Sequence, residues 1–172
     1  RWYEPSKINS NKILTKIKED DILVFDNLNN ENQNIIDNCQ NRKMLDIGQY
    51  FEFENYNNEE IVNKLYNKFD IINLNERVEQ YLIDRFNLNN SKDIFNMLKP
   101  NLIIITRGQK GSVFICKDFN ITMKLENPAE EIDPTGAGDA FFAVFISEYI
   151  KNNFIAGRRF IEMTFEKATK LT

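Results

Sequence analysis

The chain has 172 residues, of which 42% are hydrophobic and 28% charged, with a formal net charge of −4. This length and composition are typical of one globular domain with a substantial core. Acidic and basic residues are interspersed, so the sequence shows no basic patch of the kind that binds nucleic acid. Histidine is absent, which excludes histidine-based triads and histidine zinc ligands and leaves carboxylates as the general bases.

The two cysteines and the hydropathy pattern favour a particular compartment. Cys39 and Cys116 lie far apart in the sequence, without partners at metal-binding spacing. That usage is typical of a reduced intracellular protein. No signal peptide, membrane-spanning run or lipidation motif is recognisable. We therefore expect a cytoplasmic protein that does not contact a membrane.

Apolar periodicity and turn residues predict helices and strands that alternate along the chain. A first helix opens at Pro5 and Ser6, and the segment 91–98 is a helix with Ser91 as its N-cap. Further helices are predicted over 31–41, 59–69, 76–86, 141–150 and 158–171. Strands are predicted over 22–25, 43–47, 70–74 and 101–106, followed by a hairpin of 112–117 and 121–126.

Strands that alternate with helices form βαβ units, so we expect an α/β fold with a mostly parallel sheet flanked by helices. In such sheets, ligands bind beyond the carboxyl ends of the strands. Asp26, Asp46, Asn75 and Thr106 each follow or end a predicted strand, and so does the loop before the helix 141–150. We expect these features to share one edge of the molecule.

The most informative stretch is DPTGAGD, residues 133–139, which leads directly into the apolar helix 141–150. Gly136 and Gly138 let the backbone turn sharply, and successive N–H groups at a helix start form an anion cradle. Asp139 then lies in the first helical turn beside the anion, where it can take a proton from an attacking hydroxyl. The alternative is ordinary capping by an aspartate that follows a glycine turn.

Residues 133–141 resemble the signature of the ribokinase-like (PfkB) carbohydrate kinases, and TRGQKG at 106–111 resembles the T-x-G-x-x-G segment of that family. The resemblance covers about residues 22–171. It implies a Rossmann-like ribokinase fold and ATP-dependent phosphoryl transfer to a hydroxymethyl group of a sugar or nucleoside. It also implies that Asp139 is the general base and that the backbone amides of Gly136, Ala137 and Gly138 stabilise the transferring phosphoryl group.

The same resemblance implies binding residues for ATP and for cations. Thr106, Gly108 and Gly111 would line the nucleotide, and Asp133 and Thr135 would bind a monovalent cation such as K⁺. The family's N-x-x-E segment, which lies near Mg²⁺ and phosphate, resembles the stretch 73–79.

That segment departs from the family pattern. If Asn75 is the asparagine, the glutamate position holds Val78, which offers no oxygen to Mg²⁺. Glu79 lies one residue later, and Glu76 lies three residues after Asn73, so another register would supply a glutamate. A polar helix start, with an acid favourable to the helix dipole, is an equal alternative.

The family's N-terminal half has no counterpart here. That half carries the substrate-recognition segment, most sugar contacts and the small β lid. We therefore expect residues 1–172 to be a partial ribokinase-like kinase domain, its nucleotide-binding C-terminal portion, from a longer protein or a truncated gene. A shortened parallel sheet would leave an unpaired edge, and a homodimer is one expected assembly. Two functions stay open: a kinase that is inactive as the isolated chain, and a non-catalytic nucleotide-binding or interaction module.

Overall fold

The computed structural model describes residues 10–125 and 136–170. Within these ranges, six strands form one sheet in the order β1-β2-β3-β4-β5-β6. β1 to β4 pair in parallel, whereas β5 pairs antiparallel with β4 and with β6. The prediction of a mostly parallel α/β sheet is confirmed. The strands are β1 (Leu23–Phe25), β2 (Lys43–Ile47), β3 (Ile71–Asn75), β4 (Leu102–Thr106), β5 (Ser112–Cys116) and β6 (Asn120–Met123).

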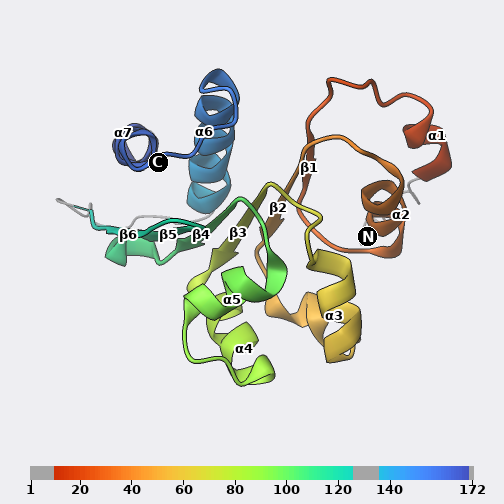
Figure 1. The fold of residues 1–172 in the computed structure, drawn as a ribbon, viewed down its shortest axis with the longest axis horizontal. Helices are drawn as coiled ribbons and strands as arrows, with labels where there is room; N and C mark the ends of the chain where they lie inside the picture. Colours follow the sequence, from red (N-terminus) through yellow and green to blue (C-terminus); the bar gives the residue numbers. More distant parts are fainter. Residues whose placement is uncertain (1–9, 126–135, 171–172) are drawn as a thin grey trace, which may run out of the picture.

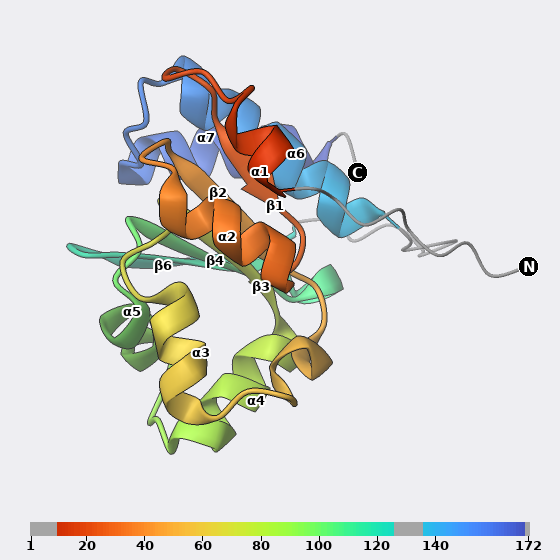
Figure 2. The ribbon, with the colours of Figure 1, turned by 90° about the vertical axis from the view of Figure 1, so that its right-hand side faces the viewer.

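Helices cover both faces of this sheet (Figure 1). The helices α1 to α5 pack on one face, where α1 lies against α2 (Figure 2), and α6 and α7 pack on the other. None of the described helices is both long and apolar enough to cross a membrane. The helices are α1 (Ser10–Leu14), α2 (Asn30–Asn38), η1 (Tyr50–Phe53), α3 (Asn58–Leu65), α4 (Glu76–Phe86), α5 (Ser91–Leu98), η2 (Gly108–Lys110), α6 (Ala137–Lys151) and α7 (Arg158–Thr169).

Several predicted boundaries are wrong for identifiable reasons. The helix predicted over 31–41 ends at Asn38, and Cys39 is already extended. Beyond it, the Asn41 amide donates to three backbone carbonyls of the segment 18–21, which ties this loop to the chain before β1. The helix predicted over 59–69 ends at Leu65, because Asn67 turns left-handed and its N–H binds the end of α5.

The N-cap of α5 also differs from the prediction. Asn90, not Ser91, is the N-cap, and its side chain accepts a hydrogen bond from the backbone N–H of Lys92. The Ser91 hydroxyl instead donates to the carboxylate of Glu79 on α4. The start of the first predicted helix, at Pro5 and Ser6, lies outside the described residues, as does the end of the last one at 171.

The β4–β5 turn requires a glycine at position 111. Gly111 has φ +91°, and a Cβ there would lie 2.0 Å from the carbonyl oxygen of Met123 on the neighbouring strand. Gly108 also has positive φ, +53°, but a Cβ there would meet nothing within 4 Å. The turn therefore tolerates a side chain at one glycine and not at the other.

We expect Gly111→Ala to lower the free energy of unfolding by about 2 kcal/mol, since it adds a backbone clash to a conformation that alanine disfavours. Gly108→Ala is the matched control and should lose only about 1 kcal/mol. Urea unfolding followed by circular dichroism measures both losses. Equal losses would show that the contact with Met123 does not matter.

Candidate functional site

The sheet face beneath α6 and α7 changes from apolar to polar along β2, β3 and β4. Met44, Ile71 and Ile104 belong to the core that α6 and α7 cover. Two residues farther along β2 and β3, the same face presents polar side chains, because strand side chains alternate with period two. Asp46 pairs with Asn73 across β2 and β3, and Asn75 pairs with Thr106 across β3 and β4. Polar groups therefore line the carboxyl edge of the sheet.

A pocket of about 190 Å³ lies at this edge, against the first turn of α6. The pocket contains residues that the sequence predicts to lie at this edge of the sheet. It also contains residues of the signature loop. It is lined by Asp26, Asp46, Ile47, Gly48, Asn73, Asn75, Thr106, Gly138 and Asp139. Helix α6 is held over the sheet by aromatic packing, in which Phe114 of β5 stacks on Phe145 with ring centroids 5.6 Å apart.

The first turn of α6 has the geometry of an anion-binding helix start. Gly136 is the N-cap with φ +82°, and as a glycine it has no side chain to cap the helix N–H groups. Its carbonyl accepts the N–H of Ala140 at 2.9 Å, which closes the first helical turn. The amides of Ala137 and Gly138 lie in the part of a helix where N–H groups have no intrahelical partner. Asp139 is exposed in the same turn. Gly138 and Asp139 line the pocket, whereas Gly136 and Ala137 are not among its lining residues.

The turn after β4 supplies one residue to this pocket. Thr106 lines it and donates its hydroxyl to the Leu74 carbonyl at 3.4 Å. Gly108 and Gly111 shape the turn but are not among the lining residues, and Gly111 N–H donates to the Gly108 carbonyl at 2.9 Å. Asp133 and Thr135, the predicted ligands of a monovalent cation, lie outside the described residues.

The stretch 73–79 places no glutamate among the lining residues of the pocket. Asn75 is the N-cap of α4, since its Oδ1 accepts the N–H of Val78 at 2.9 Å and its amide donates to the Gly48 carbonyl. Val78 is fully buried in the core. The carboxylate of Glu79 binds Arg107, with Oε1 2.7 Å from Nη2, and that of Glu76 binds Lys110 at 2.8 Å. Each glutamate of the alternative registers is thus paired with a cation from the β4–β5 turn.

Sequence reasoning named Asn73 only as the asparagine of an alternative N-x-x-E register, and the structure places it among the lining residues of the pocket. Its Nδ2 donates to Oδ1 of Asp46 at 2.9 Å. Partial burial raises the pKa of Asp46, the hydrogen bond from Asn73 opposes this, and the negative charges of Asp139 and Asp26 add to the rise. The available signal was a polar residue within the apolar run IINLN of β3.

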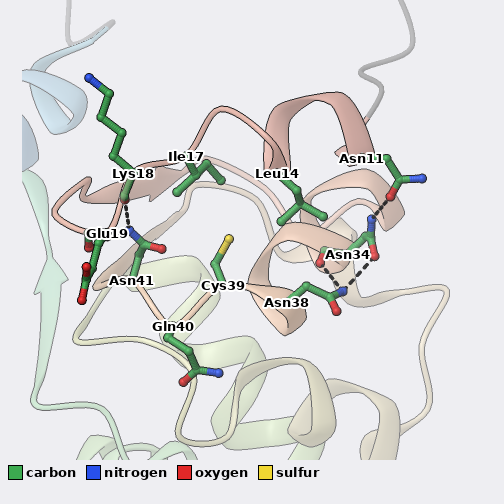
Figure 3. A pocket seen from close by; sticks show the side chains of 10 residues that line it. All are labelled: Asn11, Leu14, Ile17, Lys18, Glu19, Asn34, Asn38, Cys39, Gln40 and Asn41. Carbon is green, nitrogen blue, oxygen red and sulfur yellow. Dashed lines mark hydrogen bonds between the residues drawn. The ribbon is translucent and has the colours of Figure 1, made fainter.

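A second pocket, of about 450 Å³, lies at the opposite end of the first strands (Figure 3). It is lined by residues of α1, the end of α2 and the loops that lead into β1 and β2. The amides around it serve the chain itself: Asn38 donates to Asn34, and Asn41 donates to the Lys18 carbonyl at 2.7 Å. Because ligands of parallel sheets bind at the carboxyl ends of the strands, this pocket is not the candidate site.

Solved structures show which fold class this arrangement belongs to. A ribokinase from Thermotoga maritima superposes with a TM-score of 0.64 at 20% identity, over 94% of this chain and 51% of that chain. A fructokinase from Vibrio cholerae superposes with a TM-score of 0.65 at 16% identity, over 90% of this chain and 55% of that one. The fold is therefore ribokinase-like.

The family follows from the sequence match. The model of the pfkB family carbohydrate kinases matches residues 54–170, and the chain belongs to this family. It is 43% identical over 53 residues to a nucleoside kinase of Methanocaldococcus jannaschii, covering 31% of this chain and 18% of the relative. It is 27% identical over 109 residues to a cytidine kinase of Thermococcus kodakarensis, covering 63% and 39%. The chain spans about half the length of the two solved structures named above.

Proposed function

We propose that this chain is the catalytic, nucleotide-binding portion of an ATP-dependent kinase that phosphorylates a hydroxymethyl group of a sugar or nucleoside. One observation carries the proposal: Gly138 and Asp139, in the first turn of α6, line the pocket at the carboxyl edge of the sheet. The similarity to a nucleoside kinase and a cytidine kinase supports an acceptor of this class.

In the proposed reaction, the chain's own groups position the reactants and stabilise charge. The amides of Gly136, Ala137 and Gly138, at the positive end of the α6 dipole, hold the transferring phosphoryl group. Asp139 accepts the proton of the attacking hydroxyl. Thr106, Gly108 and Gly111 line the nucleotide from the β4–β5 turn. Because phosphoryl transfer involves little covalent chemistry by the protein, these placements account for most of the expected catalysis.

Cations belong to the proposal as well. ATP is used by kinases together with Mg²⁺, which neutralises developing phosphate charge. Val78, at the family's glutamate position, does not fit this ion, and Asn75 uses its side chain to cap α4. For a monovalent cation such as K⁺, we propose Asp133 and Thr135. The Vibrio cholerae fructokinase structure holds fructose, ADP and a potassium ion, which supports a cation of this kind.

The test uses a protein that contains this chain together with the half found in its relatives, incubated with ATP, Mg²⁺ and a panel of nucleosides and sugars. We expect ADP to form with at least one acceptor, and the product to carry a phosphate on its hydroxymethyl group by mass spectrometry. For the 172-residue chain alone, we expect ATP binding by calorimetry without turnover. No ADP formation with any acceptor would contradict the kinase assignment.

A second candidate is a non-catalytic, kinase-derived nucleotide-binding module. It is favoured by the buried Val78 and by the engagement of Glu76 and Glu79 with Lys110 and Arg107. This candidate predicts nucleotide binding by both the short and the long protein, with turnover by neither. The acceptor panel therefore separates the two candidates, because only the kinase forms ADP.

A further inference from the structure

We propose that Asp46 and Asn73 form a divalent-cation site that takes Mg²⁺ in this chain, in place of a glutamate at position 78. The role of that ion in phosphoryl transfer rests on the proposed function, whereas the site itself is inferred from the side chains at the carboxyl ends of β2 and β3. The two residues are direct partners across neighbouring strands.

The first argument is an unpaired buried oxygen. Asn73 is only 3% exposed, and among the described residues its Oδ1 is the one buried side-chain nitrogen or oxygen without a hydrogen-bond partner. Its Nδ2 donates to Asp46 at 2.9 Å, which fixes the orientation of the amide while Asp46 is charged. A buried polar atom without a hydrogen-bond partner destabilises the folded protein, because it has lost its bonds to water. A cation at the pocket floor removes that cost, because it binds the oxygen that no N–H reaches.

The second argument is the charge around the pocket. Asp26, Asp46 and Asp139 line it, and the described lining residues include neither lysine nor arginine. The nearest turn contributes Arg107 and Lys110, but these bind Glu79 and Glu76 instead. A bound cation would compensate the negative charge that these three carboxylates bring to the pocket.

The third argument concerns which cation fits. Every candidate ligand is an oxygen, and oxygen ligands suit Mg²⁺ rather than Zn²⁺. The described residues contain no cluster of three or more Asp, Glu or Cys that would enclose a metal. Mg²⁺ does not need one, since it keeps several waters and binds one or two carboxylates together with substrate phosphates. The pocket volume of about 190 Å³ is well above the roughly 10–15 Å³ that one water needs, which leaves room for a partly hydrated ion.

The experiment titrates the purified 172-residue chain with Mn²⁺, a paramagnetic substitute for Mg²⁺, in the absence of nucleotide. Loss of the free-ion electron paramagnetic resonance signal gives stoichiometry and affinity. We expect one Mn²⁺ per chain, displaced by Mg²⁺. Asp46→Asn should bind at least about tenfold more weakly, since even outer-shell partners are worth 10–100-fold in metal affinity. Asp118→Asn, an exposed aspartate on the β5–β6 hairpin, removes the same charge elsewhere and should bind as the wild type does.

A second readout needs no variant. In amide-detected nuclear magnetic resonance spectra, Mn²⁺ should broaden the side-chain NH₂ signals of Asn73 and of Asn75, which also lines the pocket, before those of the other asparagines. Absence of Mn²⁺ binding, equal affinity in Asp46→Asn, or broadening centred elsewhere would each overturn the site. The Mn²⁺ titration does not measure phosphoryl transfer, so the two proposals can fail separately. Mn²⁺ binding by this chain together with no turnover in the longer protein would contradict the proposed kinase activity but not the cation site. The reverse result, turnover in the longer protein without Mn²⁺ binding at Asn73, would refute the site alone.

Discussion

Replacing Asp139 with asparagine should lower the turnover of the complete kinase by at least about 100-fold, because general-base catalysis contributes about 10²–10⁴-fold. Asparagine keeps the size of the side chain but cannot accept the hydroxyl proton. ATP affinity should stay equal or rise slightly, since the substitution removes a negative charge beside the phosphates. Steady-state ADP formation gives turnover, and calorimetry gives the dissociation constant of ATP.

The same substitution has a structural side effect that the controls must exclude. Asp139 lies in the first turn of α6, where a negative charge interacts favourably with the helix dipole by about 0.3–1 kcal/mol. A small loss of thermal stability is therefore expected and does not explain a 100-fold loss of turnover. Asp118→Asn, on the far hairpin, should retain full activity. Turnover within a few-fold of the wild type for Asp139→Asn would remove this residue from the reaction.

The sequence alone predicted the fold because its information is local and periodic. Apolar strand segments such as 101–106 and helix faces such as 76–86 define their elements without reference to the rest of the chain. The order of these elements then implies a parallel sheet with a site at its carboxyl edge. The pocket at that edge contains Asp26, Asp46, Asn75 and Thr106, which lie at or directly after the ends of strands, together with Gly138 in the first turn of α6.

What sequence reasoning missed depends on contacts between distant segments. The partnership of Asn73 with Asp46 requires the register of β2 against β3, which residue patterns do not give. The engagement of Glu79 with Arg107 joins groups 28 residues apart. The sequence did not show whether Asn75 binds a cation or caps a helix. The structure shows the cap, because the N–H of Val78 donates to the Asn75 side chain. Local polarity alone fits both roles.

The pairing of Glu79 with Arg107 ties three elements together. Arg107, at the start of the β4–β5 turn, donates to both carboxylate oxygens of Glu79 on α4, at 2.7 and 2.9 Å from Nη2. The side chain of Glu79 is only 6% exposed, and it also accepts the hydroxyl of Ser91 on α5. The turn that is proposed to line the nucleotide is thereby fixed to two helices.

We expect Arg107→Ala to lower the free energy of unfolding by about 3 kcal/mol, because it leaves a buried carboxylate without its cation. Lys110→Ala is the matched control from the same turn. Its pair with Glu76 is exposed, with side chains 71% and 49% accessible, and should contribute only about 0–1 kcal/mol. Urea unfolding of the 172-residue chain measures both.

A double variant separates the effect of leaving the buried Glu79 carboxylate unpaired from the effect of lost side-chain packing. Replacing the whole pair by apolar residues, Arg107→Met with Glu79→Leu, removes the buried charge along with its partner, and such replacements are often neutral or stabilising. We therefore expect the double variant to be more stable than Arg107→Ala. If it is instead as unstable as the single variant, packing around α4 and not the unpaired carboxylate holds the turn. In the longer protein, the double variant should also weaken ATP binding. The protein as a whole would stay stable, but the turn after β4 would lose the hydrogen bonds that attach it to α4.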